Sequence, residues 1–347
     1  MTSLDTRKIK ILEAIVLDYV STTRPVASDR LLEVCQLGCK AATVRNEMAE
    51  MAEMGYLVQP HTSSGRIPTD RGYRYYVDEL MHPSKALTRS ETSRVKKQYE
   101  ETQSEIEEIM LQTCRILSEM TSYASVATDP LIDTTTIRRV YLSEASARHA
   151  LLVILLSTGQ VEHRLVALDV TPNDTALSQI SYYLNSLFSK KELEQCGRMD
   201  QQEIPSELNS LSMVIMKLTL VVKQAALTYS EKRIYIDGTS NLLRQPEFQD
   251  VQRLDNLLSL LEERNALYKV LSHSLLGGEL TILIGMENRI ELMQDYTLVS
   301  ASYMIGARTA GYLGVVGPTR MNYDRAVAAV GFMAQSLSSV LTQLNLA

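Results

Sequence analysis

The sequence of 347 residues lacks any long apolar run. The longest, Ala150 to Leu156, is far shorter than the roughly 18 residues that a membrane-spanning helix needs. The first residues also lack the apolar stretch of a secretory signal, because charge begins at Asp5. We therefore expect a cytoplasmic protein with no membrane partner. A chain of this length is expected to form two or three domains, each with its own core.

Cysteine and histidine are few and scattered. Neither the four cysteines nor the five histidines show the close spacing of a metal site. A complete phosphate-binding glycine motif and a nucleophile elbow are also absent. We therefore expect no metal, no cofactor and no catalytic residues, so the protein is predicted not to be an enzyme. The cysteines are expected to be reduced and structural: Cys35, Cys39, Cys114 and Cys196.

Positive charge is not in excess either. The formal net charge is −6, which argues against a protein that coats nucleic acid through bulk charge. Residues 1–82 hold ten Lys or Arg against eleven Asp or Glu, and only the stretch 61–76 is locally positive. Any DNA binding must therefore come from a local surface.

The first 82 residues predict a winged helix-turn-helix. Apolar spacing indicates a helix from about Ile9 to Val20, a second helix that Ser28 caps, and a third from about Ala41 to Met54. Residues 56–58 and Ile67 read as two short strands around a polar loop, and a helix follows Thr69 and Asp70. Three helices and a small hairpin in this order are typical of a winged-helix DNA-binding domain.

Several side chains in this domain have the chemistry to contact DNA. Arginine can grip guanine and asparagine can grip adenine in the major groove, and Thr43, Arg45 and Asn46 lie near the start of the third helix. The alternative is that these residues are only the solvated face of an amphipathic helix. The loop and the helix behind it add hydroxyl groups and cations suited to phosphates or the minor groove: His61, Thr62, Ser63, Ser64, Arg66, Arg71 and Arg74.

The rest of the chain predicts an α+β fold of several domains. Residues 83–122 read as a linker and a connector helix. Strand patterns occupy about 136–170 and 280–316, a helix follows at about 323–344, and the segment between the strand groups is mainly helical. We predict one α+β domain of residues 123–175 plus 275–347, interrupted by a helical insertion of residues 176–274. Two separate small domains are the alternative.

One helix of this insertion carries a regular apolar stripe. Its residues repeat at alternating steps of three and four, as in a seam between paired helices: Leu208, Leu211, Ile215, Leu218, Val222, Ala225 and Tyr229. A helix packed inside its own domain would show the same pattern.

Longer motifs resemble one family. The segments 42–48, 55–69 and 72–77 read ATVRNEM, GYLVQPHTSSGRIPT and GYRYYV, and 238–242, 245–248, 284–288 and 314–323 read GTSNL, QPEF, IGMEN and GVVGPTRMNY. In this order they resemble the heat-inducible transcription repressor family HrcA. The resemblance covers nearly the whole chain.

The resemblance implies a winged-helix domain, a GAF-like α+β domain and an inserted dimerising domain. It also implies a repressor of heat-shock chaperone operons that binds the double-stranded inverted-repeat operator CIRCE as a homodimer. Heat would relieve repression through availability of the GroE chaperonin, and the repressor would be nucleoid-associated when bound to its operator. Temperature would act either on the protein itself or through the chaperonin.

Two positions depart from the family pattern. Ala27 stands where the family usually has glycine, and Lys40 stands where a serine would usually cap the recognition helix. Loss of such a cap costs about 1 kcal/mol, and a cation at a helix N-terminus is unfavourable. We therefore expect Lys40 to serve another purpose, namely contact with a DNA phosphate.

An alternative function is a small-molecule-responsive winged-helix regulator. In that case the GAF-like domain would be the sensor, and ligand rather than heat would release DNA. Its contacts would come from Tyr303, Arg308 and Arg320.

Overall fold

The computed structural model separates the chain into two compact units. The first comprises Met1–Gln103, Glu108–Ala127 and Ile234–Gln343, and the second comprises Ser104–Glu107, Thr128–Arg233 and Leu344–Ala347. We call residues 4–83 of the first unit the head, its remainder the sheet domain, and the second unit the inserted unit. The structure describes residues 4–34, 40–61, 64–83, 87–100, 105–130, 135–157, 159–169, 172–200, 203–230, 234–263, 267–268, 270–271 and 280–346.

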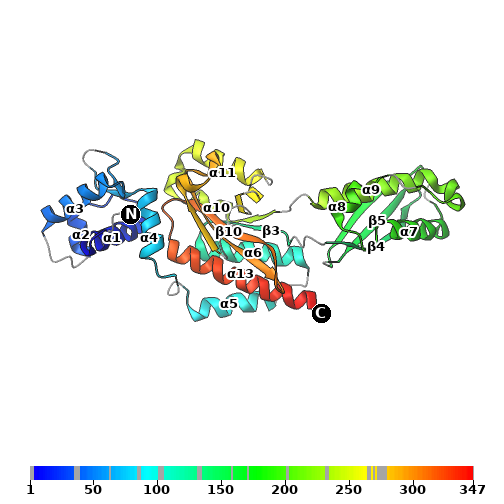
Figure 1. The fold of residues 1–347 in the computed structure, drawn as a ribbon, viewed down its shortest axis with the longest axis horizontal. Helices are drawn as coiled ribbons and strands as arrows, with labels where there is room; N and C mark the ends of the chain where they lie inside the picture. The colour runs from blue at the N-terminus through cyan, green and yellow to red at the C-terminus, as the bar shows by residue number, and fades with distance from the viewer. Residues whose placement is uncertain are drawn as a thin grey trace. The chain divides into compact units, whose positions relative to one another are not determined.

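The head has the predicted order of helices and strands (Figure 1). Ile11, Leu12 and Ile15 of the first helix are fully buried, as their helical spacing predicts. The first helix ends at Thr22, where Thr23 adopts a left-handed conformation with φ 61°. The elements are α1 (Thr6–Thr22), α2 (Ser28–Val34), α3 (Ala41–Glu53), β1 (Leu57–Val58), β2 (Ile67–Pro68) and α4 (Asp70–Glu79).

The sheet domain is built on five strands in the order β7-β3-β10-β9-β8. The strands are β3 (Ala124–Thr128), β7 (Ile234–Asp237), β8 (Leu280–Ile284), β9 (Tyr296–Ile305) and β10 (Arg308–Pro318). Strands β8, β9 and β10 pair antiparallel in sequence order, and β3 pairs antiparallel with β10. The strand group predicted at about 280–316 is therefore confirmed.

Helices cover both sides of this sheet (Figure 1). On one side lie α6 (Ile106–Thr121) and α13 (Tyr323–Leu346), with α5 (Arg89–Glu100) beyond them. On the other side lie α10 (Thr239–Leu242) and α11 (Val251–Glu262), together with the short helices η3 (Pro246–Gln249) and η5 (Glu291–Met293). The short helix η4 (Gly285–Glu287) directly follows β8. The predicted connector helix is thus two helices, and α6 belongs to the core, where Met110, Cys114 and Leu117 are fully buried.

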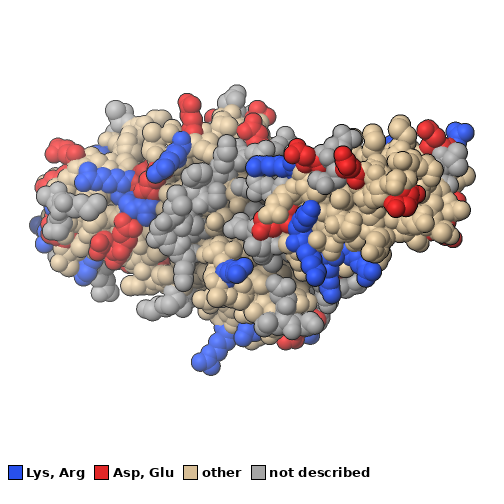
Figure 2. Space-filling view, turned by 45° about the vertical axis from the view of Figure 1, so that its right-hand side comes forward, with Lys and Arg blue, Asp and Glu red and all other residues tan. Residues whose placement is uncertain are grey.

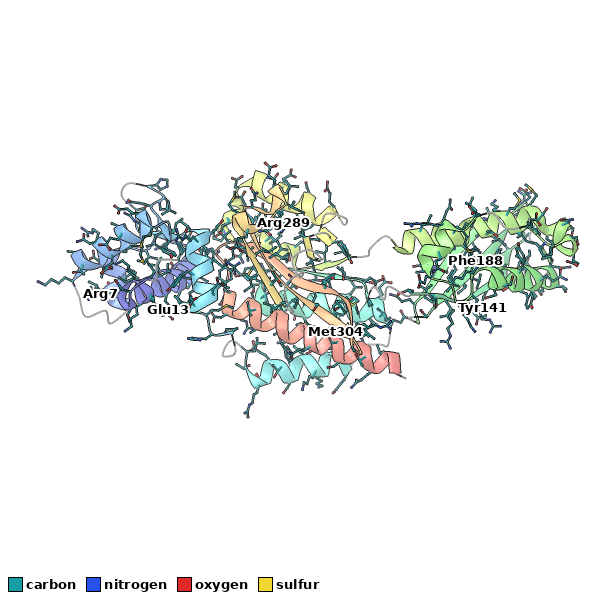
Figure 3. All side chains as sticks on the ribbon, viewed as in Figure 1. Arg7, Glu13, Tyr141, Phe188, Arg289 and Met304 are labelled. Carbon is teal, nitrogen blue, oxygen red and sulfur yellow. The ribbon has the colours of Figure 1, made fainter. Side chains whose placement is uncertain are left out.

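The inserted unit holds a second, smaller sheet. Strands β4 (Ile137–Ser146), β5 (His149–Leu156) and β6 (Val161–Ala167) form an antiparallel sheet of their own. Its helices are α7 (Asp174–Phe188), α8 (Leu193–Arg198), η2 (Ser206–Leu211) and α9 (Ser212–Ser230). Phe188 is fully buried in the core, whereas Tyr141 is 46% exposed (Figure 3).

This arrangement differs from the predicted domain boundaries. The strands at 137–167 do not join the C-terminal strands, and β7, α10 and α11 belong to the sheet domain rather than to the insertion. The insertion is therefore 128–233 instead of 176–274. An alternating apolar pattern indicates that one face of a strand is buried, but it does not indicate which strand lies beside it. Three strands covered by three helices bury enough apolar surface to form a separate core.

The apolar stripe predicted as a dimer seam lies inside the inserted unit. Ile215, Leu218, Val222 and Ala225 are buried against the three-stranded sheet and α7, with Leu208 and Leu211 packed beside them. The Tyr229 side chain lies outside the described residues. The ordinary helix-packing interpretation of this stripe is therefore the correct one.

Two helices are long and apolar enough, by length and composition alone, to cross a membrane, at Ser206–Leu227 and Tyr323–Leu344. Both contribute buried residues to the domain cores, Leu218 in one and Leu337 in the other. Cys114 and Cys196 are buried free thiols, as predicted, while Cys35 and Cys39 lie outside the described residues.

The insertion replaces the tip of a hairpin. Ser125 Oγ lies 3.4 Å from the carbonyl oxygen of Asp237, and a side chain at Gly238 would meet the carbonyl oxygen of Tyr123 at 2.8 Å. The first residues of β3 therefore lie beside the last residues of β7. Because these neighbouring strands run in opposite directions, the chain leaves β3 and re-enters β7 at the same edge of the sheet.

Candidate nucleic-acid interface

Helix α3 presents the side chains predicted to read bases. Val44, Met48 and Met51 are buried and hold the helix in the head. Arg45 and Asn46 lie on the opposite, exposed face, and Thr43 is half-buried at its edge. The orientation of α3 therefore leaves the predicted groove-contacting side chains open to solvent.

Lys40 begins this helix without capping it. Its backbone has the extended conformation of an N-cap residue (φ −85°, ψ 156°), but its side chain makes no capping hydrogen bond. The side chain is exposed. The cation is therefore placed at the start of α3, next to the groups expected to face DNA.

A cluster of charges joins α1 to the back of α3. Lys8 Nζ lies 2.6 Å from Glu47, 2.9 Å from Glu50 and 3.2 Å from Asp5, and Arg7 lies 3.3 Å from Glu47. The hydrogen bond to Glu47, followed by that to Glu50, raises the pKa of Lys8. Glu47 and Glu50 of α3 are thus paired with cations of α1, so they oppose the DNA phosphates less than free carboxylates would.

This cluster was not predicted from the sequence. Lys8 occupies a position on the inner side of α1, where helical spacing gives no reason to expect a cation. Figure 2 shows acidic and basic side chains interspersed on the visible face of the molecule, as the balanced composition of the head indicates.

The wing consists of β1, β2 and the loop that joins them. Leu57 pairs with Pro68 and Val58 pairs with Ile67. The Ser64 hydroxyl donates to the His61 carbonyl at 2.7 Å and accepts the His61 amide at 2.9 Å, so it shapes the turn. His61 is exposed, while Thr62 and Ser63 lie outside the described residues.

Arg66 is fixed by its backbone, and its side chain is half-buried. Its amide and carbonyl both pair with Val26 at 2.9 Å, which ties the wing to the segment between α1 and α2. Within the part of the chain that the structure describes, Nε of Arg66 has no hydrogen-bond partner. The neighbouring Gly65 is required sterically, because a Cβ there would lie 2.3 Å from the Val26 carbonyl oxygen.

Arg71 and Arg74 have partners within the protein. Arg71 donates to the Met54 carbonyl at 2.8 Å and lies over the Tyr56 ring, 4.6 Å from its centroid. It therefore joins the end of α3 to the wing. Arg74 pairs with Glu287 and Asp78, and the interaction with Glu287 raises its pKa. This geometry favours structural roles for both arginines.

The residues considered for a small-molecule sensor do not gather around a cavity. Tyr303 is fully buried, whereas Arg308 is exposed. Arg320 is buried and binds Glu247, Gln245 and the Val20 carbonyl. In the described ranges of the chain, no group of three or more His, Cys, Asp or Glu is placed to hold a metal ion.

Comparisons with known proteins agree on one family. A family model described as the HrcA protein C terminal domain matches residues 107–327. The chain is 41% identical over 344 residues to a heat-inducible transcription repressor HrcA of Moorella thermoacetica, covering 98% of this chain and 99% of that protein. It is 37% identical to the protein of the same name from Desulforudis audaxviator, again over 98% and 99% of the two chains.

A solved structure has a similar fold. A crystal structure of a hypothetical protein superposes with a TM-score of 0.71 at 24% identity, covering 99% of this chain and 100% of that one.

Proposed function

Since the chain belongs to the HrcA family of heat-inducible transcription repressors, we propose that it represses transcription as a dimer that binds an inverted-repeat operator. Each of the two heads would bind one half of the operator through α3 and the wing. It is a bacterial transcription repressor of the heat-shock response, it is not an enzyme, and it acts in the cytoplasm. The operator we propose is CIRCE, ahead of chaperone operons, with the GroE chaperonin as the partner whose availability sets activity. Bound to this operator, the repressor would lie on the nucleoid.

The exposed face of α3 is the observation that carries the DNA-binding proposal. Arg45 and Asn46 are the side chains suited to base edges, and Thr43 supports them. Lys40, His61, Ser64 and Arg66 are assigned to the DNA backbone or the minor groove, together with Thr62 and Ser63 of the wing. Arg71 and Arg74 are proposed to act on DNA only indirectly, because their guanidinium groups bind Met54 and Glu287.

Two substitutions separate base reading from backbone contact. Arg45→Ala should abolish discrimination between the operator and scrambled DNA, whereas Arg66→Ala should weaken binding to both by similar factors. Fluorescence anisotropy with both duplexes at fixed salt measures this. Equal losses on the two duplexes for Arg45→Ala would contradict base reading by α3.

The dimer surface is proposed to be the outer face of α9. Met213, Met216, Leu220 and Leu227 are 43% to 76% exposed and follow one another at helix-pairing steps if Lys223 is included. A groove of about 630 Å³ lies along the first three of them. A stripe of this kind on one helix can pair with its own copy across a two-fold axis, which is the symmetry that an inverted repeat requires.

A charge placed in the stripe tests the dimer surface. Leu220→Glu should yield monomers in sedimentation velocity and lose operator affinity, while single half-site binding persists. Leu165→Glu is the matched control, because Leu165 is 63% exposed on the open face of the three-stranded sheet. Monomers from Leu165→Glu and dimers from Leu220→Glu would assign the interface to the sheet instead.

A further inference from the structure

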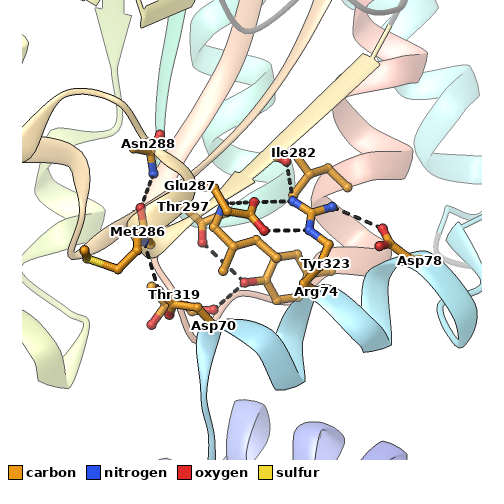
Figure 4. Close-up of polar contacts among 12 residues, drawn as sticks. Asp70, Arg74, Asp78, Ile282, Met286, Glu287, Asn288, Thr297, Thr319 and Tyr323 are labelled. Atoms are coloured by element: carbon orange, nitrogen blue, oxygen red, sulfur yellow. Dashed lines mark hydrogen bonds and ion pairs between the residues drawn. The ribbon is translucent and has the colours of Figure 1, made fainter. Parts of the chain in front are cut away.

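The head is attached to the sheet domain by hydrogen bonds, ion pairs and packed aromatic rings, and not by its linker alone. Figure 4 shows α4 of the head beside the edge strand β8, with polar contacts between residues of α4 and residues of and directly after β8. Three groups of contacts form this attachment, which we call the junction. They involve Arg74, Asp70 and Tyr76 of α4, and Arg320 beside α1.

Arg74 makes the central contact of the junction. Its Nε donates to Glu287 at 2.8 Å, Nη2 makes a second and shorter contact with the same carboxylate, and Nη2 also donates to the Ile282 carbonyl at 2.6 Å (Figure 4). Glu287 is itself held, because it accepts the Ile284 amide at 2.8 Å. A two-point pair between arginine and carboxylate fixes direction as well as distance.

Asp70 and Tyr76 flank this pair on the same helix. The Asp70 carboxylate accepts the Met286 amide at 2.9 Å, and it lies so close to Gly285 that a Cβ there would be 2.0 Å from Oδ2. Tyr76 donates its hydroxyl to Asp324 at 2.5 Å. Between them, buried Tyr73 packs against Tyr323 with ring centroids 5.6 Å apart.

Arg320 holds the head at a second helix. It is only 7% exposed, it pairs with Glu247 through two nitrogens, and Nη1 donates to the Val20 carbonyl at 2.7 Å near the end of α1. Two helices of the head are therefore anchored to the sheet domain. Rotation of the head about either anchor would break the other.

We propose that the junction determines which spacing between half-sites the repressor accepts. A dimer reads an inverted repeat when its two heads sit at a fixed separation and rotation on the duplex. Any freedom at the junction adds directly to the freedom of each head. Arg74, Glu287, Tyr76 and Asp324 are thus positioning residues for operator recognition, although none of them belongs to the face of α3. This inference rests on the proposed two-headed function.

The test varies the spacer of an inverted-repeat duplex in the full-length protein. Wild type should bind best at one spacer and lose about 100-fold in affinity when five base pairs are added, because half a helical turn moves the second half-site out of reach. Glu287→Gln with Asp324→Asn should reduce that loss to about tenfold or less. Affinity for a single half-site should stay unchanged.

The controls separate the possible failures. Glu263→Gln with Glu291→Gln also removes two negative charges, but from exposed positions of the sheet domain, and should keep the wild-type dependence of affinity on spacer length. Tyr76→Phe with Glu287→Gln keeps the buried ring and provides a second variant should the first unfold. A wild-type spacer profile in both folded junction variants would overturn the inference. Wild type that prefers no spacer would instead overturn the proposed dimeric function.

Discussion

Replacement of Lys40 by serine should stabilise α3 and weaken the salt dependence of operator binding. The Lys40 carbonyl already accepts the amides of Thr43 and Val44 at 2.9 and 3.2 Å, so the backbone is set for a cap. A serine hydroxyl can accept a free amide of the first turn, which contributes about 1 kcal/mol. Removal of the cation adds a few tenths of a kcal/mol at this exposed site. The expected gain is therefore about 1 to 1.5 kcal/mol.

The effect on DNA binding has a separate magnitude. One phosphate contact fewer for each head lowers the slope of log K against log salt by about 0.9 per head, or about 1.8 per dimer. At low salt the affinity should fall, and at high salt the difference from wild type should shrink. Stability and affinity thus change in opposite directions, which explains how a lysine can occupy a capping position.

Hydrogen exchange of the α3 amides measures the first effect, and fluorescence anisotropy over a range of salt measures the second. Lys40→Ala is the control, because it removes the charge without supplying an acceptor. It should show the same change in salt slope but little gain in protection. Equal protection in both variants would refute the capping argument, and an unchanged slope would refute the phosphate contact.

Two further predictions concern stability. Gly65→Ala places a Cβ 2.3 Å from the Val26 carbonyl oxygen and should cost about 1 to 3 kcal/mol in urea unfolding, because that oxygen pairs with the wing. The second prediction concerns Glu91, whose Oε1 lies 2.5 Å from Nη2 of Arg325; this ion pair lowers the pKa of Glu91 from 4.5 to about 2. The stabilisation of the fold by ionised Glu91 is therefore present above pH 4.5 and is lost as the pH falls towards 2. Glu91→Gln should be less stable than wild type at pH 6 and equally stable near pH 2, as measured by denaturant unfolding at each pH.

The results that would contradict these two predictions differ. Unchanged unfolding of Gly65→Ala would mean that the loop yields without loss of its pairing to the segment after α1. A stability difference for Glu91→Gln that stays constant from pH 6 to pH 2 would mean that the ion pair with Arg325 does not contribute through its charge.

Local pattern predicted the head well because its signals are local. Helical spacing from Ile9 to Val20, the end of the third helix near Met54 and the helix after Thr69 all reappear in the structure. Gly55 has φ +79°, a conformation that favours glycine, and the Thr69 hydroxyl accepts the Gly72 amide. Each of these features involves residues only a few positions apart.

Partners distant in sequence were not predictable in the same way. The pattern of β5 reports one buried face, but it does not tell whether β4 or a C-terminal strand lies beside it. Likewise the stripe containing Ile215 and Leu218 reports burial without saying against what. Arg74 was expected to touch DNA because a surface arginine near a wing suggests it, whereas its partner Glu287 is 213 residues away.

The origin of the inserted unit at a hairpin tip has a consequence for modularity. Because the chain leaves β3 and returns through β7 at one edge of the sheet, the end of β3 and the start of β7 lie close together in the sheet domain. A short turn could join Thr128 to Ile234 and leave both strands in place, since hairpin connections of two to five residues are common. Such a miniature would keep a DNA-reading head on its sheet while discarding the segment proposed for self-association, and the same attachment point would accept a foreign assembly module.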